Sequence, residues 1–82
     1  MGASIVQYAG KGQATCVTLN GLELYFSYGT CIGVRVHGSL IVAVNQWGTM
    51  TGRHIDCIPG VAGAVRVAHE DLLVTIDQLK VA

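Results

Sequence analysis

The residues best suited to chemistry lie in the central part of the chain, between Tyr28 and His54. Large aromatic rings supply contact area at a low cost in conformational entropy, and a guanidinium supplies forked, charge-assisted hydrogen bonds. This combination is typical of a surface that binds another molecule. We expect six residues to form such a surface: Tyr28, Asn45, Trp47, Thr51, Arg53 and His54.

The aromatic rings could instead fill the core, because only 6% of the residues are aromatic and a thin core needs them. For Tyr25 and Phe26 we favour the core role. For Tyr28 and Trp47 the two roles are equally open.

The segment Thr51-Gly52-Arg53-His54 allows two interpretations. A glycine-bearing turn that enters a helix presents free N–H groups, and together with Arg53 it could hold an anion. Alternatively, Thr51 is the N-cap of a short helix and His54 is a hydrogen-bonded structural residue. Capping explains the spacing without a ligand, so we favour it.

The spacing of histidine and cysteine gives little support for a metal site. His54 and Cys57 are one helical turn apart and could form half of a zinc site. A structural zinc ion needs four ligands in recognised spacings, and only His37 and His69 could complete the set by folding close. We therefore expect no metal.

A catalytic group is equally hard to assemble from the sequence. Nucleophilic catalysis by cysteine would need a histidine and an orienting carboxylate beside it. Cys16, Cys31 and Cys57 lie in or beside apolar runs, which is typical of buried thiols. We expect a protein that is not an enzyme and has no catalytic residues and no cofactor.

Two segments resemble a family of small uncharacterised proteins of bacteriophages and their bacterial hosts. Residues 25–32, YFSYGTCI, are similar to the family's YFSYxTxI segment, and residues 45–55, NQWGTMTGRHI, are similar to its NxW and TGKHL segments. The residues from Arg66 to Leu79 fit its closing strand and helix more weakly. The chain departs from the pattern at Gly33, where a larger residue is common, and at Arg53, where Lys is usual.

The resemblance implies a phage-like origin and no mechanism, because the family has no established activity. Small phage proteins often act by binding: they block a host defence protein, sequester a signalling nucleotide or redirect a host enzyme. By this analogy we expect a small binding protein that acts on a host protein. A nucleic-acid-binding regulator and a nucleotide-sequestering protein are the alternatives.

The composition predicts self-association. Of the 82 residues, 51% are hydrophobic and only 12% are charged, about half of the usual ~25%. A small monomer has a large surface relative to its volume and needs polar residues to cover it. We therefore expect a homo-oligomer, the alternative being a monomer covered by Gly, Thr, Ser and Gln.

The charge distribution argues against nonspecific binding of nucleic acid. The formal net charge is zero and the basic residues are scattered, whereas duplex-binding proteins neutralise many phosphates. A site assembled by symmetry from Arg35 and Arg53 of several subunits, with Trp47, stays open. Three cysteines without a CxxC pair, no apparent signal peptide and no long apolar run predict a cytoplasmic protein with free thiols and no membrane contact.

The first half of the chain has the pattern of short strands, which must position the candidate residues. We expect strands at residues 4–8, 15–19, 22–27, 30–36 and 40–45, separated at Gly10-Lys11-Gly12, Asn20-Gly21, Tyr28-Gly29 and His37-Gly38. Asn-Gly is the strongest short hairpin signal, because a type I′ turn needs positive φ at both central positions. The run from Leu40 to Val44 is apolar on both faces, which is typical of a strand covered on both sides.

The second half changes character. We expect a loop at residues 46–52, one helical turn at residues 53–58 ended by Pro59-Gly60, a connector at residues 61–64 and a last short strand at residues 65–67. A C-terminal helix then starts near His69, with Glu70 and Asp71 in its first turn, Lys80 in its last, and a buried face made of Leu72, Leu73, Ile76 and Leu79.

A strand through Leu72, Val74 and Ile76 is the competing interpretation of this last segment. The sequence thus predicts one α+β domain over residues 1–82. It consists of an antiparallel β-meander of four or five strands with a short helical turn and a C-terminal α-helix.

Overall fold

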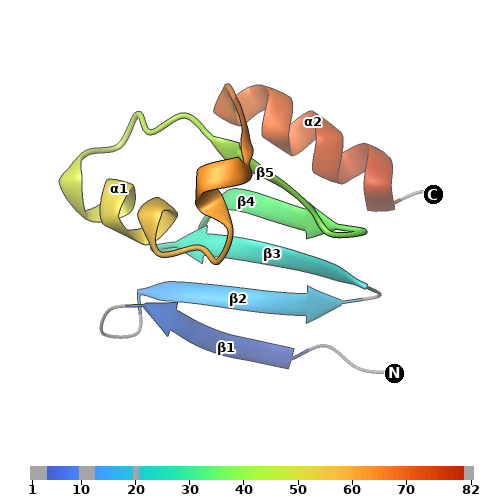
Figure 1. Cartoon of the computed structure of the whole chain (residues 1–82), viewed down its shortest axis with the longest axis horizontal. Coiled ribbons are helices and arrows are strands. Elements are labelled where there is room, and N and C mark those ends of the chain that lie inside the picture. Colours follow the sequence, from blue (N-terminus) through green and yellow to red (C-terminus); the bar gives the residue numbers. More distant parts are fainter. Residues whose placement is uncertain (1–3, 10–12, 20, 81–82) are drawn as a thin grey trace.

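The computed structural model describes residues 4–9, 13–19 and 21–80 and confirms the α+β class (Figure 1). The strands are β1 (Ser4–Ala9), β2 (Ala14–Leu19), β3 (Leu22–Ser27), β4 (Thr30–Val36), β5 (Ser39–Ala43) and β6 (Val65–Val67). The helices are α1 (Thr49–Asp56), a 3-10 turn η1 (Val61–Gly63) and α2 (His69–Lys80). The helical interpretation of the C-terminal segment is therefore correct, and the competing strand is not formed.

Strands β1 to β5 form an antiparallel meander in chain order. The β3–β4 link has φ of 51° at Tyr28 and 83° at Gly29, and the β4–β5 link has 52° at His37 and 80° at Gly38. Positive φ at both central residues is the type I′ geometry, which matches the twist of the strands that it joins. The predicted breaks at residues 28–29 and 37–38 are confirmed, whereas Gly10-Lys11-Gly12 and Asn20 lie outside the described residues.

The sheet has six strands, where four or five were expected, because the short segment Val65–Val67 also joins it. It pairs in parallel with β5, with Val42 opposite Arg66. Parallel neighbours need a long crossover connection, and the segment between Ala43 and Val65, which contains α1 and η1, supplies it. β5 itself ends at Ala43, two residues earlier than expected.

One face of the sheet is covered by α1 and the segment that follows it. The core on this side contains Tyr25, Ile32, Leu40 and Val42 from the sheet and Ile55 and Ile58 from the covering segment. Tyr25 is 3% exposed, so its predicted core role is confirmed, whereas Phe26 is only half-buried.

The other face is covered by α2, which packs on β4 and β5. Val34 and Ala43 are buried against Leu72, and Ile76 and Leu79 pack around them. Leu73 is exposed, so its predicted place on the buried face is wrong. At about 100° per residue it is turned away from Leu72, and the sheet contacts only one stripe of the helix.

The N-terminal end of the sheet extends beyond the helices, which gather over the region from β3 to β5 (Figure 1). Ile5 and Val6 of β1 are exposed. Neither α1 nor α2, the α-helices among the described residues, has the length and hydropathy that a membrane-spanning helix requires.

Candidate functional site

Helix α1 positions three of the six candidate residues. It starts at Thr49, four residues before the expected turn. Thr51, His54 and Ile55 follow i, i+3, i+4 spacing and form the buried face that meets the sheet. The helix therefore presents His54 to the sheet and leaves its other face in solvent.

A buried hydrogen-bonded network joins this face to the end of β3. The Ser27 Oγ atom lies 2.6 Å from Nδ1 of His54 and 3.0 Å from Oγ1 of Thr51. The exposed fractions are 1% for Ser27, 8% for Thr51 and 3% for His54. Because polar groups buried together must satisfy one another, the network fixes the angle at which α1 meets the β3–β4 hairpin.

A serine bonded to a histidine is also an arrangement of nucleophilic catalysis. A nucleophile must reach its substrate, and the Ser27 side chain is enclosed. The geometry of Ser27, Thr51 and His54 therefore fits a positioning role.

Tyr28 lies directly above the network. Its ring centroid is 5.5 Å from that of His54, with the planes tilted by 39°, and the residue is 54% exposed. A side chain other than glycine, Asn or Asp at a φ of 51° is uncommon and costs about 1–2 kcal/mol. The backbone N–H of Tyr28 also donates to the carbonyl of Gln13, at 2.9 Å. The backbone of Tyr28 is thus fixed by its turn, and its exposed ring lies beside the ring of His54.

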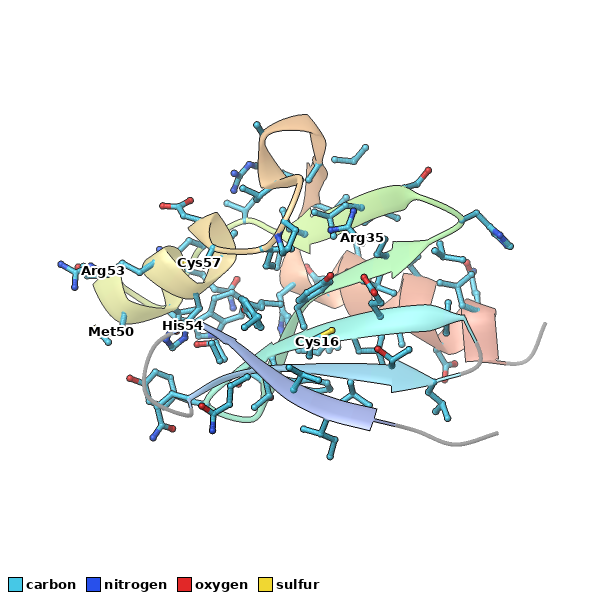
Figure 2. The ribbon with its side chains drawn as sticks, turned by 60° about the horizontal axis from the view of Figure 1, so that its bottom comes forward. Cys16, Arg35, Met50, Arg53, His54 and Cys57 are labelled. Carbon is cyan, nitrogen blue, oxygen red and sulfur yellow. The ribbon has the colours of Figure 1, made fainter. Side chains whose placement is uncertain are left out.

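The outward face of α1 carries Met50 and Arg53, which are one turn apart. Met50 is 50% exposed and Arg53 is exposed. Figure 2 shows both side chains on the side of the helix that is away from the sheet, with His54 directed towards the sheet. Met and Arg, like aromatic residues, are enriched where proteins bind one another. We call three exposed residues, Met50 and Arg53 of α1 and Tyr28 beside His54 of the same helix, the exposed cluster.

Asn45 organises the loop before α1. Its Oδ1 accepts from the backbone N–H of Trp47 at 3.0 Å, and its Nδ2 donates to the carbonyl of Gly48 at 2.9 Å. A Cβ atom on Gly52 would lie 2.8 Å from Nδ2 of Asn45, so the amide packs against the helix where only glycine leaves room. Asn45 is exposed, but its side-chain amide is hydrogen-bonded to the backbone of the loop.

Trp47 is half-buried and packs against both parts of the core, one on the α1 face of the sheet and one on the α2 face. Its ring contacts His69 edge-on at 4.9 Å between centroids, and Nε2 of His69 lies 3.1 Å from the carbonyl oxygen of Cys31. Trp47 therefore ties the loop to the start of α2. Of its two expected roles, packing accounts for its position.

The interpretation of Thr51 as an N-cap is wrong. Gly48 occupies that position, no side chain caps the helix, and the Thr51 hydroxyl bonds to Ser27 instead. The anion-binding interpretation loses its free N–H at Gly52, which donates to the carbonyl of Gly48 at 3.0 Å. The glycine-bearing turn was assumed to precede the helix, whereas it lies within it.

The two arginines expected to bind nucleic acid differ in their surroundings. The Nε atom of Arg35 donates to Glu23 Oε1 at 3.0 Å, and its Nη2 atom donates to the Pro59 carbonyl. The side chain of Arg53 has no hydrogen bond or ion pair among the described residues. The hydrogen bond with Tyr25 raises the pKa of Arg35. Figure 2 shows Arg35 and Arg53 well apart, so a single copy of the chain does not bring the proposed nucleic-acid-binding arginines together.

The cysteines differ from the expectation of buried thiols. Cys16 and Cys31 are half-buried, and burial raises the pKa of both thiols. Cys57 is exposed, because it follows α1 on the solvent side. Within the described residues, no cluster of three His, Cys, Asp or Glu side chains could hold a metal ion.

Two residues of the site were missed in the sequence. Ser27 was not among the six expected site residues, although it shares a strand face with buried Tyr25 by alternation. Met50 was placed in a loop, and its spacing to Arg53 is informative only once the helix is known to begin at Thr49. No protein-family model, curated protein or solved structure matches the chain.

Proposed function

We propose that this chain is a small, non-enzymatic binding protein that self-associates and contacts a protein of a bacterial host in the cytoplasm through its exposed cluster. The observation that carries the proposal is Tyr28: a large ring, 54% exposed, is held at positive φ above a buried histidine. His37 has the same type I′ backbone, so the feature that distinguishes Tyr28 is its large exposed ring beside the ring of His54. The resemblance to phage proteins supports the choice of a host protein as the partner.

The chemistry of the exposed cluster favours a protein partner. An aromatic ring, a thioether and a guanidinium, here one without an ion pair among the described residues, are groups enriched at protein interfaces. They protrude from elements that are joined by Ser27, Thr51 and His54, so little backbone conformational entropy is lost on binding.

The test is a capture experiment from bacterial lysate with the tagged chain and a Tyr28→Asn, Arg53→Ala double variant. Asn tolerates positive φ, so the turn is preserved while the ring is lost. We expect a protein that is retained by the wild type and released by the double variant. Arg66→Ala, which removes an exposed arginine from β6, is the matched control and should retain it.

Equal retention by the wild type and the double variant would overturn the proposal. Two further measurements test the alternative functions. Captured nucleic acid that is released steeply by salt would indicate the nucleic-acid-binding regulator. A rise in melting temperature with cyclic or linear nucleotides would indicate a nucleotide-sequestering protein, because a ligand bound only by the folded state stabilises it.

A further inference from the structure

Strand β1 forms one edge of the sheet, and among the described strands it has a neighbour on one side only. In an edge strand, every second pair of backbone N–H and C=O groups points away from the sheet and can pair with another strand. Proteins commonly protect such an edge with charged side chains or proline. β1 reads Ser-Ile-Val-Gln-Tyr-Ala and contains neither.

The side chains of β1 fit a strand that is covered on both faces. Cross-strand partners share a face, so Ile5 lies on the α2 side through Val17 and Leu24, and Val6 lies on the α1 side. Ile5 is 71% exposed and Val6 is 58% exposed. β1 therefore carries one exposed apolar side chain on each face, and the polar Gln7, which shares the face of Ile5, is uncharged.

The opposite edge of the sheet differs from β1. β6 has three residues and carries the exposed Arg66. Pairing of β1 with β6 of another copy would continue head to tail into a ring or an open filament. Pairing of β1 with another β1 offers a longer strand without charge, and it closes around a two-fold axis.

We propose that β1 pairs antiparallel with β1 of a second copy, so that two six-stranded sheets become one continuous sheet in a closed dimer. The inference rests on the self-association in the proposed function and assigns its surface. A neutral strand paired with itself places no like charges opposite one another, and a chain of zero net charge adds no repulsion between copies.

The interface would occupy a modest part of the surface of the chain. A specific interface needs about 500 Å² from each partner at its lower limit, which is about a tenth of the 4930 Å² surface of this chain. Leu19 of β2 is 41% exposed on the same face as Ile5 and extends the apolar area beside the paired edge. Burial of these side chains adds to the backbone hydrogen bonds of the paired strands.

The test is the mass of the full chain and of two lysine variants by size-exclusion chromatography with light scattering. We expect the wild type at twice 8.6 kDa and Val6→Lys with its dimer dissociation constant raised at least about tenfold. Val74→Lys places the same charge at an exposed apolar site on α2 and should keep the mass of the wild type. Far-ultraviolet circular dichroism checks that both variants fold.

The outcomes separate this inference from the proposed self-association. A wild type with the mass of one protomer would overturn both. A dimer that survives Val6→Lys would overturn the β1 pairing and leave self-association standing. Should Val6→Lys fail to fold, amide hydrogen exchange of the wild type tests whether β1 pairs with a second copy. We expect the outward amides of β1 to lose protection on dilution, and the same exchange at high and low concentration would refute the pairing.

Discussion

Ser27 and His54 are joined by a hydrogen bond of 2.6 Å between Oγ and Nδ1, although they are 27 positions apart in the chain. Together with Thr51, they connect the end of β3 to helix α1 in the interior. The exposed ring of Tyr28 lies over this connection. The geometry of the candidate surface thus depends on a small polar network that solvent does not reach.

Removal of Ser27 from the network is expected to destabilise the fold. Ser27→Ala leaves the buried Nδ1 of His54 without its partner, so we expect the free energy of unfolding to fall by about 1–3 kcal/mol. Thr51→Val should cost less, because the shape of the side chain is kept. Urea unfolding measures both.

The two substitutions should not be additive, because Ser27 and Thr51 share one hydrogen bond. We expect a coupling energy of at least about 0.5 kcal/mol from the double-mutant cycle. Thr49→Ala, at the exposed start of the same helix, serves as the control and should combine additively with Ser27→Ala. Strict additivity of Ser27→Ala and Thr51→Val would show that the Ser27–Thr51 hydrogen bond contributes no stability.

Tyr8→Phe is expected to stabilise the protein. The Tyr8 ring packs edge-on against Tyr25 at 5.3 Å between centroids, and its buried hydroxyl has no hydrogen-bond partner among the described residues. Burial also raises the pKa of Tyr8, because the charged form is disfavoured there. Removing the unpaired oxygen should raise the free energy of unfolding by about 1 kcal/mol. A lower melting temperature for Tyr8→Phe would contradict this prediction.

The stability of the protein should decline in alkaline solution partly because of Tyr25. Burial raises the pKa of Tyr25 from 10.0 to about 12. The folded state therefore holds the phenolic proton of Tyr25 more tightly than the unfolded state does. The contribution of this proton to the free energy of unfolding is complete below pH 10 and disappears as the pH rises towards 12. Tyr25→Phe has no phenolic proton to lose. Between pH 10 and about 12 we therefore expect the free energy of unfolding to fall more steeply for the wild type than for this variant. Parallel stability curves for the two proteins would rule out the assignment to Tyr25.

Gly33 is expected to resist enlargement. It lies opposite Val42 in the sheet, and a Cβ atom there would be 3.2 Å from Val42 Cγ1, 3.3 Å from Ile58 Cδ1 and 3.4 Å from the carbonyl oxygen of Ile41. Gly33→Ala should lower the free energy of unfolding by about 1–3 kcal/mol through overpacking. This is also the position at which the resembled phage family commonly has a larger residue.

The matched control is Gly63→Ala. An added Cβ atom at Gly63 meets nothing within 4 Å in the described structure, so we expect a change of no more than about 0.5 kcal/mol. Comparable losses for the two variants would indicate that chain flexibility, and not crowding beneath α1, explains the glycine at position 33.

Local patterns in the sequence were sufficient for the meander and for the last helix. The apolar run after Ser39 predicted a strand covered on both faces, and glycine at positions 29 and 38 predicted tight turns. These features depend on neighbours within a few positions, where alternation and the sign of φ constrain the chain directly. The spacing of Leu72, Ile76 and Leu79 predicted the helix for the same reason, although it placed Leu73 on the wrong face.

The tertiary structure decided the features that join distant segments. The start of α1 at Thr49, the parallel pairing of β6 with β5 and the bond from Ser27 to His54 have no local signature. Three of the first four residues of α1 are Thr or Gly, which have low helix propensity, so packing against the sheet stabilises the helix there. The sequence by itself determined which residue types were available for a site, and the folded chain determined that Tyr28, Met50 and Arg53 would be exposed. Which side of α1 faces solvent depends on where the sheet lies, and the sheet is assembled from strands that come before and after the helix.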